Sequence, residues 1–245
     1  MGKKRRNRNT GQKTHFELFS EKIIGKEAPL KQKARIVQKC PDEIDNRETP
    51  LKNLKEIWKR QARIIGRLAD RRYTEHEMNT ILKAAGIRPA DRIASIASGI
   101  GIMEAYLAKN VVTEGKIVCI DLAHSISKKA LEVKRKSGAK NLSVITGSAT
   151  NIPLSTSSQN KILLMGSNLE LTIHWKPFLK EARRVLKKNF RSRLVFAGLL
   201  RSRSEIPEIV DSLERNGFML ESIVRFAMFT KCPEAIMFVA SPKLK

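Results

Sequence analysis

A glycine-containing segment is the first part of this sequence whose residue types could do chemistry. Segment 95–101, SIASGIG, follows an apolar run and leads directly into a helical pattern. Glycine at a strand-to-helix turn lets the backbone approach a ligand closely, and the N-terminus of the helix offers free N–H groups to that ligand. Glycine pairs also occur where two elements simply pack closely, so the segment needs a second feature before it indicates a binding site.

Asp121 supplies that second feature, because it ends the next apolar run, 116–121. If the two runs form neighbouring parallel strands, their carboxyl ends meet at one edge of the sheet. An acid at that edge is placed to accept hydrogen bonds from the ribose hydroxyls of a nucleoside. The alternative role for Asp121 is to cap the following helix, for which Ser125 would serve equally well. The glycine turn and the acid together predict a nucleoside-binding site.

The elements that would position these residues alternate between strand and helix from residue 92 onward. Apolar runs with the length of strands occupy 92–97, 116–121, 142–146, 161–166 and 193–198. Helical periodicity occupies 102–110, 125–137, 175–187 and 204–216. Two further apolar runs follow Gly217 without a helix between them, which indicates an antiparallel hairpin. The sequence therefore predicts an α/β, Rossmann-like fold with a mostly parallel seven-stranded sheet, a terminal antiparallel hairpin and a basic N-terminal helical extension.

The chain divides into three predicted regions. Residues 1–48 are polar, basic and aperiodic, which predicts a disordered extension. Residues 49–88 form a predicted helical segment, in which Thr49-Pro50 begins one helix and the capping box at 74–77 begins another. Residues 89–245 form the predicted Rossmann-like domain.

The sequence is strongly basic: 48 Lys and Arg against 24 Asp and Glu give a net charge of +24. Such an excess is typical of proteins that bind polyanions, because cations on the protein release counterions from phosphates. The candidate RNA-binding residues lie in the N-terminal extension and along one face of the helix that follows it: Lys3, Lys4, Arg5, Arg6, Arg8, Lys55, Lys59, Arg63 and Arg67. The alternatives are a solvated surface, a nuclear address and attraction to an anionic membrane.

The sequence lacks the features of disulfide-rich, metal-binding, membrane-spanning and secreted proteins. The three cysteines form no C-x-x-C pair and the four histidines form no metal-binding pair, so we predict neither a disulfide framework nor a metal site. No stretch reaches the roughly 18 apolar residues of a membrane span, and the N-terminus lacks the apolar region of a secretory signal. We therefore expect an intracellular, cytoplasmic protein, with nuclear or mitochondrial residence as the alternatives.

Two more segments extend the pattern begun by the glycine turn: GSATNIP at 147–153, after the third predicted strand, and FLKEARRVLK at 178–187. With 95–101 and Asp121, they resemble the ordered motifs of class I S-adenosylmethionine-dependent methyltransferases, especially those with the type-11 domain. The resemblance runs from about Ile81 to Pro242 and implies S-adenosyl-L-methionine as the cofactor. The cofactor-binding residues that it implies are Ser95, Ala97, Gly99, Gly101, Asp121, Leu122, Ser148 and Ala149.

The sequence departs from the family motifs at several positions. Ser95 and Ala97 replace the first acid and the first glycine of D-x-G-x-G-x-G, and Ser148 replaces an acid that contacts adenine in the family. Lys161 replaces the acid before the fourth strand, and Asn189-Phe190 replaces a Pro-Gly-Gly turn. Each lost charge-assisted hydrogen bond would weaken cofactor binding by about 1.5–3 kcal/mol.

The resemblance and the basic charge together predict a methyltransferase that acts on RNA, with ribosomal RNA favoured because a long basic arm suits a large, phosphate-rich particle. RNA or the ribosome is the expected partner. The substrate-facing segment follows the fourth strand, where Asn168 and Glu170 are candidates to orient the substrate or else to cap the next helix. Because motif acids are missing, one alternative is a non-catalytic RNA- or ribosome-binding protein. Another is a small-molecule methyltransferase.

Overall fold

Seven strands form one sheet in the computed structural model, which describes Phe19, Lys22 and residues 75–166, 174–199, 205–226 and 235–244. The strands are β1 (Arg92–Ile96), β2 (Lys116–Asp121), β3 (Leu142–Thr146), β4 (Lys161–Met165), β5 (Arg193–Leu199), β6 (Phe218–Phe226) and β7 (Ala235–Pro242). Their order is β3-β2-β1-β4-β5-β7-β6. The first five strands pair in parallel, whereas β7 is antiparallel to both β5 and β6. The predicted Rossmann-like sheet with a terminal antiparallel hairpin is confirmed.

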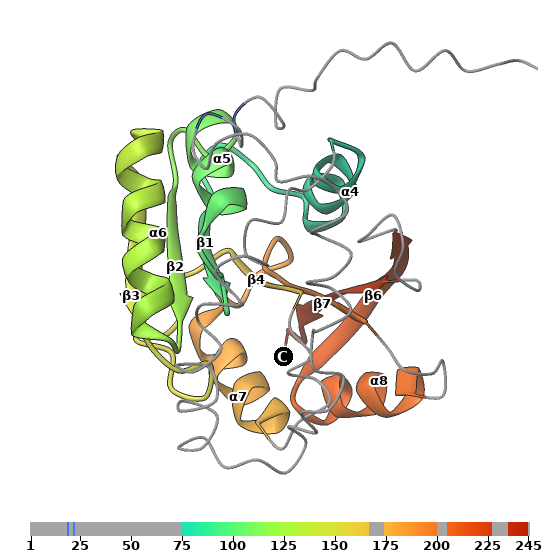
Figure 1. Ribbon diagram of the computed structural model, residues 1–245. Coiled ribbons are helices and arrows are strands. Elements are labelled where there is room, and N and C mark those ends of the chain that lie inside the picture. The colour runs from blue at the N-terminus through green and yellow to red at the C-terminus, as the bar shows by residue number, and fades with distance from the viewer. Residues whose placement is uncertain are drawn as a thin grey trace, which may run out of the picture.

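Helices cover both faces of this sheet (Figure 1). They are α4 (Glu75–Ala85), α5 (Ile102–Asn110), α6 (His124–Ser137), α7 (Trp175–Val185) and α8 (Glu205–Arg215). Helices α4, α5 and α6 share one hydrophobic cluster with one side of the strands, and α7 and α8 share a second cluster with the other side. Successive residues of β1 divide between the two clusters: Ile93 belongs to the first, and Ala94 to the second. A strand buried on both faces explains why the apolar runs are continuous rather than alternating.

Local sequence accounts for the ends of several helices. Gly86 follows α4 and Gly138 follows α6, both with positive φ, as glycine at a helix C-terminus commonly has. Helix α7 buries Trp175, Phe178 and Leu179 on the side that faces the sheet. The three- and four-residue spacing of those apolar positions is the reason that the sequence predicted this helix. None of the helices among the described residues has the length and apolar character needed to cross a membrane.

Different segments of the chain gather at the two ends of the parallel strands. At the carboxyl edge, β1 and β2 end in the glycine turn and Asp121. At the amino edge, the end of α7 lies against the residues before β4, because Lys187 N donates to Gln159 O at 2.9 Å. The C-terminal segment reaches the same edge, since Ala240 pairs with Leu194 near the start of β5. Residues that act at the two edges are therefore separated by the length of the strands.

Candidate functional site

The glycine turn lies at the carboxyl ends of β1 and β2, as its sequence predicted. Ser98 N donates to Ile120 O at 3.3 Å, and Gly101 N donates to Ser98 O at 3.3 Å. Gly99 and Gly101 have φ values of 59° and 72°. A Cβ at Gly99 would meet nothing within 4 Å, whereas a Cβ at Gly101 would lie 3.1 Å from Cys119 Sγ. Gly99 therefore faces open space, and Gly101 is required for packing beneath the turn.

Ala97 adopts a glycine conformation although it is not glycine. Its φ is 50°, one of two positive values among the described non-glycine residues. The backbone at this position therefore has the left-handed conformation that glycine adopts at the least cost. Left-handed geometry costs an L-residue roughly 1–2 kcal/mol, so the turn retains its shape at the expense of stability.

Ala97→Gly is expected to raise the free energy of unfolding by about 0.5–1 kcal/mol. The substitution removes the left-handed strain, and the greater entropy of glycine in the unfolded chain offsets part of the gain. Urea denaturation measures the change. Ser157→Gly, at the second positive-φ position (51°), is a matched control that lies in another loop and is expected to give a similar gain. Destabilisation by Ala97→Gly would show that Ala97 is held in place by contacts of its methyl group.

Asp121 connects the glycine turn to the start of α6. Its Oδ2 accepts a hydrogen bond from Gly99 N at 3.0 Å, and its Oδ1 accepts one from Ala123 N at 2.9 Å. Ala123 is the N-cap residue of α6, so Asp121 supports the helix start and the turn at once. Burial raises the pKa of Asp121, and the two backbone donors oppose that increase. A carboxylate fixed beside the open face of Gly99 is in the place expected for an acceptor of ribose hydroxyls.

Ser95 is paired with a buried carboxyl group that the sequence motifs did not single out. Ser95 Oγ donates to Glu104 Oε1 at 2.6 Å, and Glu104 is 3% exposed. Glu104 comes from the first turn of α5, directly after the glycine turn. Where the family motif has an acid on β1, this chain has a serine on β1 and an acid on α5. The signal that could have found Glu104 is that it is the single charged residue between Arg92 and Lys109.

Burial raises the pKa of Glu104 from 4.5 to about 7, and the hydrogen bond from Ser95 opposes that increase. A raised pKa means that the folded protein holds this proton more tightly than the unfolded chain does. The stability associated with the protonated carboxyl is therefore fully present below pH 4.5 and is lost as the pH rises through about 7.

Glu104→Gln should remove this dependence, because glutamine keeps the neutral form and can still accept the hydrogen bond from Ser95. We expect the variant and the parent protein to have similar stability below pH 4.5. The variant should then be more stable by up to about 3 kcal/mol at about pH 8. Urea denaturation between about pH 4 and pH 8 measures the difference, with the exposed Glu114→Gln as control. A difference that does not vary with pH would contradict a neutral Glu104.

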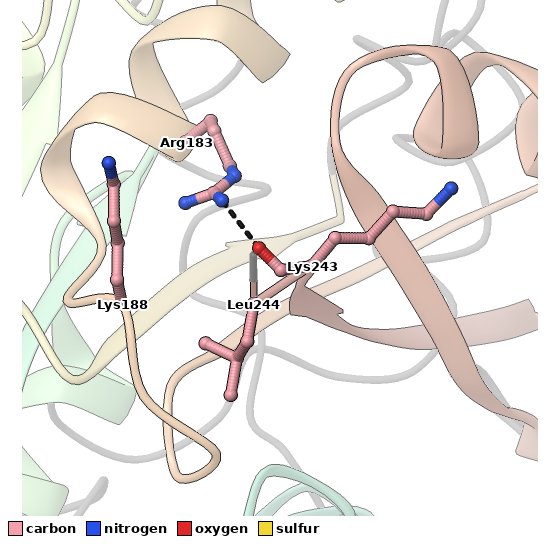
Figure 2. A pocket seen from close by; sticks show the side chains of 4 residues that line it. All are labelled: Arg183, Lys188, Lys243 and Leu244. Carbon is pink, nitrogen blue, oxygen red and sulfur yellow. Dashed lines mark hydrogen bonds between the residues drawn. The ribbon is translucent and has the colours of Figure 1, made fainter.

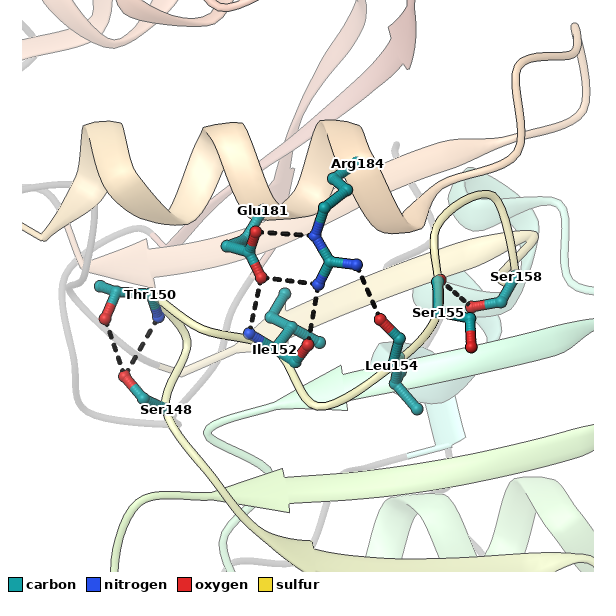
Figure 3. Close-up of polar contacts among 8 residues, drawn as sticks. All are labelled: Ser148, Thr150, Ile152, Leu154, Ser155, Ser158, Glu181 and Arg184. Carbon is teal, nitrogen blue, oxygen red and sulfur yellow. Dashed lines mark hydrogen bonds and ion pairs between the residues drawn. The ribbon is translucent and has the colours of Figure 1, made fainter.

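A clamp from α7 holds the segment after β3 in place (Figure 3). Arg184 donates to Leu154 O at 2.8 Å and to Ile152 O at 2.9 Å, and Glu181 Oε2 accepts from Ile152 N at 2.8 Å. Arg184 and Glu181 also form an ion pair at 2.7 Å, and the hydrogen bond from Arg184 lowers the pKa of Glu181. The position of Arg184 in the R-V-L-K segment is thus explained by a structural task, which is to fix 152–154.

Ser148 directs its hydroxyl into its own turn. Ser148 Oγ accepts from Thr150 N at 3.2 Å and lies 2.9 Å from Thr150 Oγ1 (Figure 3). Ala149 and Leu122 are half-buried and follow β3 and β2 respectively. Gly147 N donates to Asp121 O at 2.9 Å, which joins this segment to the carboxyl edge. The structure therefore brings the ends of β1, β2 and β3 together, with Ser148 already engaged in a local contact.

The remaining predicted residues lie outside the part of the chain that the structure describes. These are the catalytic candidates Asn168 and Glu170 and the RNA-binding candidates Lys3, Lys4, Arg5, Arg6, Arg8, Lys55, Lys59, Arg63 and Arg67. Within the described part, no group of three or more His, Cys, Asp or Glu side chains is arranged to hold a metal ion.

The carboxyl edge presents the kinds of group that bind a nucleoside. The turn offers backbone groups beside the open face of Gly99, and Asp121 offers a fixed acceptor. Glu104 places a second carboxyl near Gly101, where a Cβ would lie 4.0 Å from Glu104 Oε2. The two carboxyl groups differ in access, because Asp121 lies beside the open face of Gly99 whereas Glu104 is buried beneath Gly101.

Comparison with known proteins gives a matching family and several similar folds. Residues 93–189 match a family described as "Methyltransferase domain". A SAM-dependent methyltransferase from Aquifex aeolicus is 23% identical, with a TM-score of 0.56 over 67% of this chain and 88% of that one. Geranyl diphosphate C-methyltransferase from Streptomyces coelicolor, solved with S-adenosyl-L-homocysteine, is 11% identical, with a TM-score of 0.56 over 68% and 78%.

The fold is also shared by a protein named for a different reaction. The cyclase SpnF is 10% identical, with a TM-score of 0.66 over 78% of this chain and 96% of that one. No curated protein matches the sequence.

Proposed function

We propose that this chain, which carries a class I methyltransferase domain in residues 93–189, is an S-adenosylmethionine-dependent methyltransferase that acts on RNA. The observation that carries the cofactor part is the contact of Asp121 with Gly99 N at the open face of the turn. The observation that carries the RNA part is the net charge of +24, which suits a polyanionic substrate. Ribosomal RNA is the favoured substrate, because a long basic extension suits a large particle.

S-adenosylmethionine as the cofactor is supported by the matched domain and by solved proteins of the same fold. Asp121 would hold the ribose, and the turn at Gly99 and Gly101 would hold the methionine part. When bound, the cofactor supplies an electrophilic methyl group. The protein's own task is then to align that methyl group with the nucleophile and to exclude water, which accounts for much of the rate in displacement reactions.

The Glu104 carboxyl is expected to make cofactor binding depend on pH. Because the family's acid is absent from β1, we infer that its part is taken by Glu104, which lies beneath the turn and which Ser95 fixes in position at 2.6 Å. A pKa of about 7 lets Glu104 be ionised when a cationic amino group lies nearby and neutral when it does not. Cofactor binding should therefore be tighter at about pH 8 than at about pH 6.

A second candidate function is RNA binding without methyl transfer. It is favoured by Ser148, whose hydroxyl is engaged with Thr150 at the position where the family has an acid that contacts adenine. The fold alone does not require methyl transfer, since the cyclase SpnF shares it.

Transfer of a labelled methyl group to RNA tests the proposal. The protein is incubated with S-adenosylmethionine labelled on the methyl carbon and with ribosomal, transfer or messenger RNA fractions, and label in each RNA is counted. Label in ribosomal RNA that depends on Asp121 would support the proposal. Cofactor binding without label in any fraction would contradict RNA methylation, and RNA binding without cofactor binding would favour the non-catalytic alternative.

A further inference from the structure

A basic pocket lies at the amino edge of the sheet, at the opposite end from the glycine turn. Its volume is about 380 Å³, and it is lined by Arg183, Lys188, Lys243 and Leu244 (Figure 2). Arg183 comes from the last turn of α7, Lys188 from the loop after it, and Lys243 from the segment after β7. Ser158 N donates to Val185 O at 2.9 Å, which places the end of α7 beside the residues that precede β4.

The pocket has cations and no acid among its lining residues. Arg183 Nη2 donates to Lys243 O at 2.7 Å, whereas Arg183 Nη1 is buried and has no hydrogen-bond partner among the described residues. Lys188 is exposed, and in Figure 2 the Lys243 amine extends away from Arg183. A buried guanidinium nitrogen without an acceptor leaves part of its hydrogen-bonding capacity unused, and an anion entering the pocket would satisfy it.

Among the described residues, no ion pair joins Arg183, Lys188 or Lys243 to an acid. Glu181 pairs with Arg184 at 2.7 Å, and Glu221 pairs with Arg193 at 2.7 Å. The contact of Lys243 Nζ with Glu214, at 3.5 Å, is to the backbone oxygen and not to the carboxylate. The positive charge of the pocket is therefore available to an external anion.

An exposed aromatic ring lies in the same loop as Lys188. Phe190 is 70% exposed, and the Arg191 guanidinium carbon lies 5.3 Å from the centroid of its ring. The loop is anchored from below, because the buried Lys161 donates to Arg191 O at 2.6 Å and Asn189 Oδ1 accepts from Arg191 N at 3.0 Å. Phe190 is thus an exposed aromatic ring on an anchored loop that also carries Lys188 of the pocket.

We propose that the Arg183 pocket and Phe190 form a second contact for single-stranded RNA, in which the pocket holds a backbone phosphate and Phe190 stacks against a base. The inference rests on the proposed function in so far as RNA is the substrate. Phosphate suits Arg183, because guanidinium donors match its oxygens. An unpaired base suits Phe190, since bases inside a duplex are already stacked and cannot cover the ring.

Binding of a fluorescein-labelled oligouridine of about twelve nucleotides to the full-length protein tests this inference, with anisotropy read at several salt concentrations. Phe190→Ala is expected to weaken binding about tenfold, because one stacked base is lost. Lys188→Gln is expected to weaken binding and to reduce the slope of log K against log salt by about 0.7, the value for one phosphate contact on a single strand. Both residues are exposed, so folding should not change.

Matched substitutions on α6 distinguish a specific contact at this site from nonspecific electrostatic attraction of RNA to the basic protein surface. Leu131→Ala removes an apolar side chain that is 49% exposed, and Lys128→Gln removes one exposed charge. Larger effects at Phe190 and Lys188 than at these controls support the second contact. Equal effects at both places overturn it while leaving RNA as a ligand. A parent protein that does not bind the oligonucleotide overturns both the second contact and the proposed RNA substrate, and S-adenosylmethionine titration then shows whether the cofactor site survives.

Discussion

Asp121→Asn is expected to lower the affinity for S-adenosylmethionine by about a hundredfold or more. The carboxylate accepts hydrogen bonds from Gly99 N and Ala123 N, at 3.0 and 2.9 Å. In asparagine, one of those oxygens becomes an NH₂ group that faces a backbone donor, so the turn must shift. The ribose hydroxyls also lose a charged acceptor, and charge-assisted hydrogen bonds contribute roughly 1.5–3 kcal/mol each.

Calorimetric titration with S-adenosylmethionine and S-adenosylhomocysteine measures this loss. Asp211→Asn makes the same change on the exposed surface of α8, where Asp211 pairs with Arg215 at 3.0 Å, and it should leave affinity unchanged. Thermal unfolding of each variant distinguishes a lost ligand contact from a lost fold. Unaltered affinity in a folded Asp121→Asn protein would mean that Asp121 serves only to join the turn to α6.

Neutralising the cluster of basic residues at positions 3–8 is expected to reduce RNA affinity on the order of a thousandfold at low salt. The change replaces Lys3, Lys4, Arg5, Arg6 and Arg8 with glutamine in the full-length chain. If each cation neutralises one phosphate, the slope of log K against log salt should fall by about 3.5 for a single strand. Anisotropy titrations between low and high salt measure both quantities.

Helix α6 and its flanking turn offer a control of equal charge for this cluster. The exposed cations Lys128, Lys129, Arg135, Lys136 and Lys140 lie there and can be replaced by glutamine as a set. If the N-terminal cluster clamps phosphate specifically, its neutralisation should change the slope more than the α6 set does. The same slope change for both sets would show that RNA responds to net charge alone.

The fold could be predicted from the sequence because the apolar runs, the helical periodicity and the turn residues all indicate the same elements. The apolar runs at 116–121 and 142–146 became β2 and β3 with the predicted bounds, and 102–110 became α5. The run at 116–121 is short, continuous and mostly buried, which is the pattern of a strand covered on both faces, whereas β3 lies at the edge of the sheet, with Ser143 and Thr146 exposed. The start of α6 moved by one residue, to His124, because Asp121 supports the backbone N–H of Ala123. Asp121 and Ala123 are close in the chain, but the sequence could not show which side chain would accept the hydrogen bond from Ala123 N.

The candidate site was predictable in its backbone and less so in its side chains. The turn and Asp121 are positioned by strand ends, and strand ends follow from the apolar pattern. Ser95 and Glu104 lie on different elements, so their contact depends on how α5 packs over β1. Lys161 replaces a family acid, and only the structure shows that its amine donates to Arg191 O at the amino edge. Contacts between helices and strands determine the roles of these side chains, and the pattern of residue types along the sequence does not reveal those contacts.

Cys119 gives the glycine turn a chemical reporter of its own. The residue lies in β2 directly beneath Gly101, its side chain is inaccessible, and burial raises the pKa of its thiol well above the usual value. A thiol reagent can therefore react only when the structure around Cys119, which includes the turn, opens, so the labelling rate measures the free energy of that opening. With Cys40 and Cys232 replaced by serine, any molecule that settles on the turn should slow the labelling in proportion to its occupancy. Ligands can thus be ranked by the protection that they give to one sulfur atom, without knowledge of the reaction that follows.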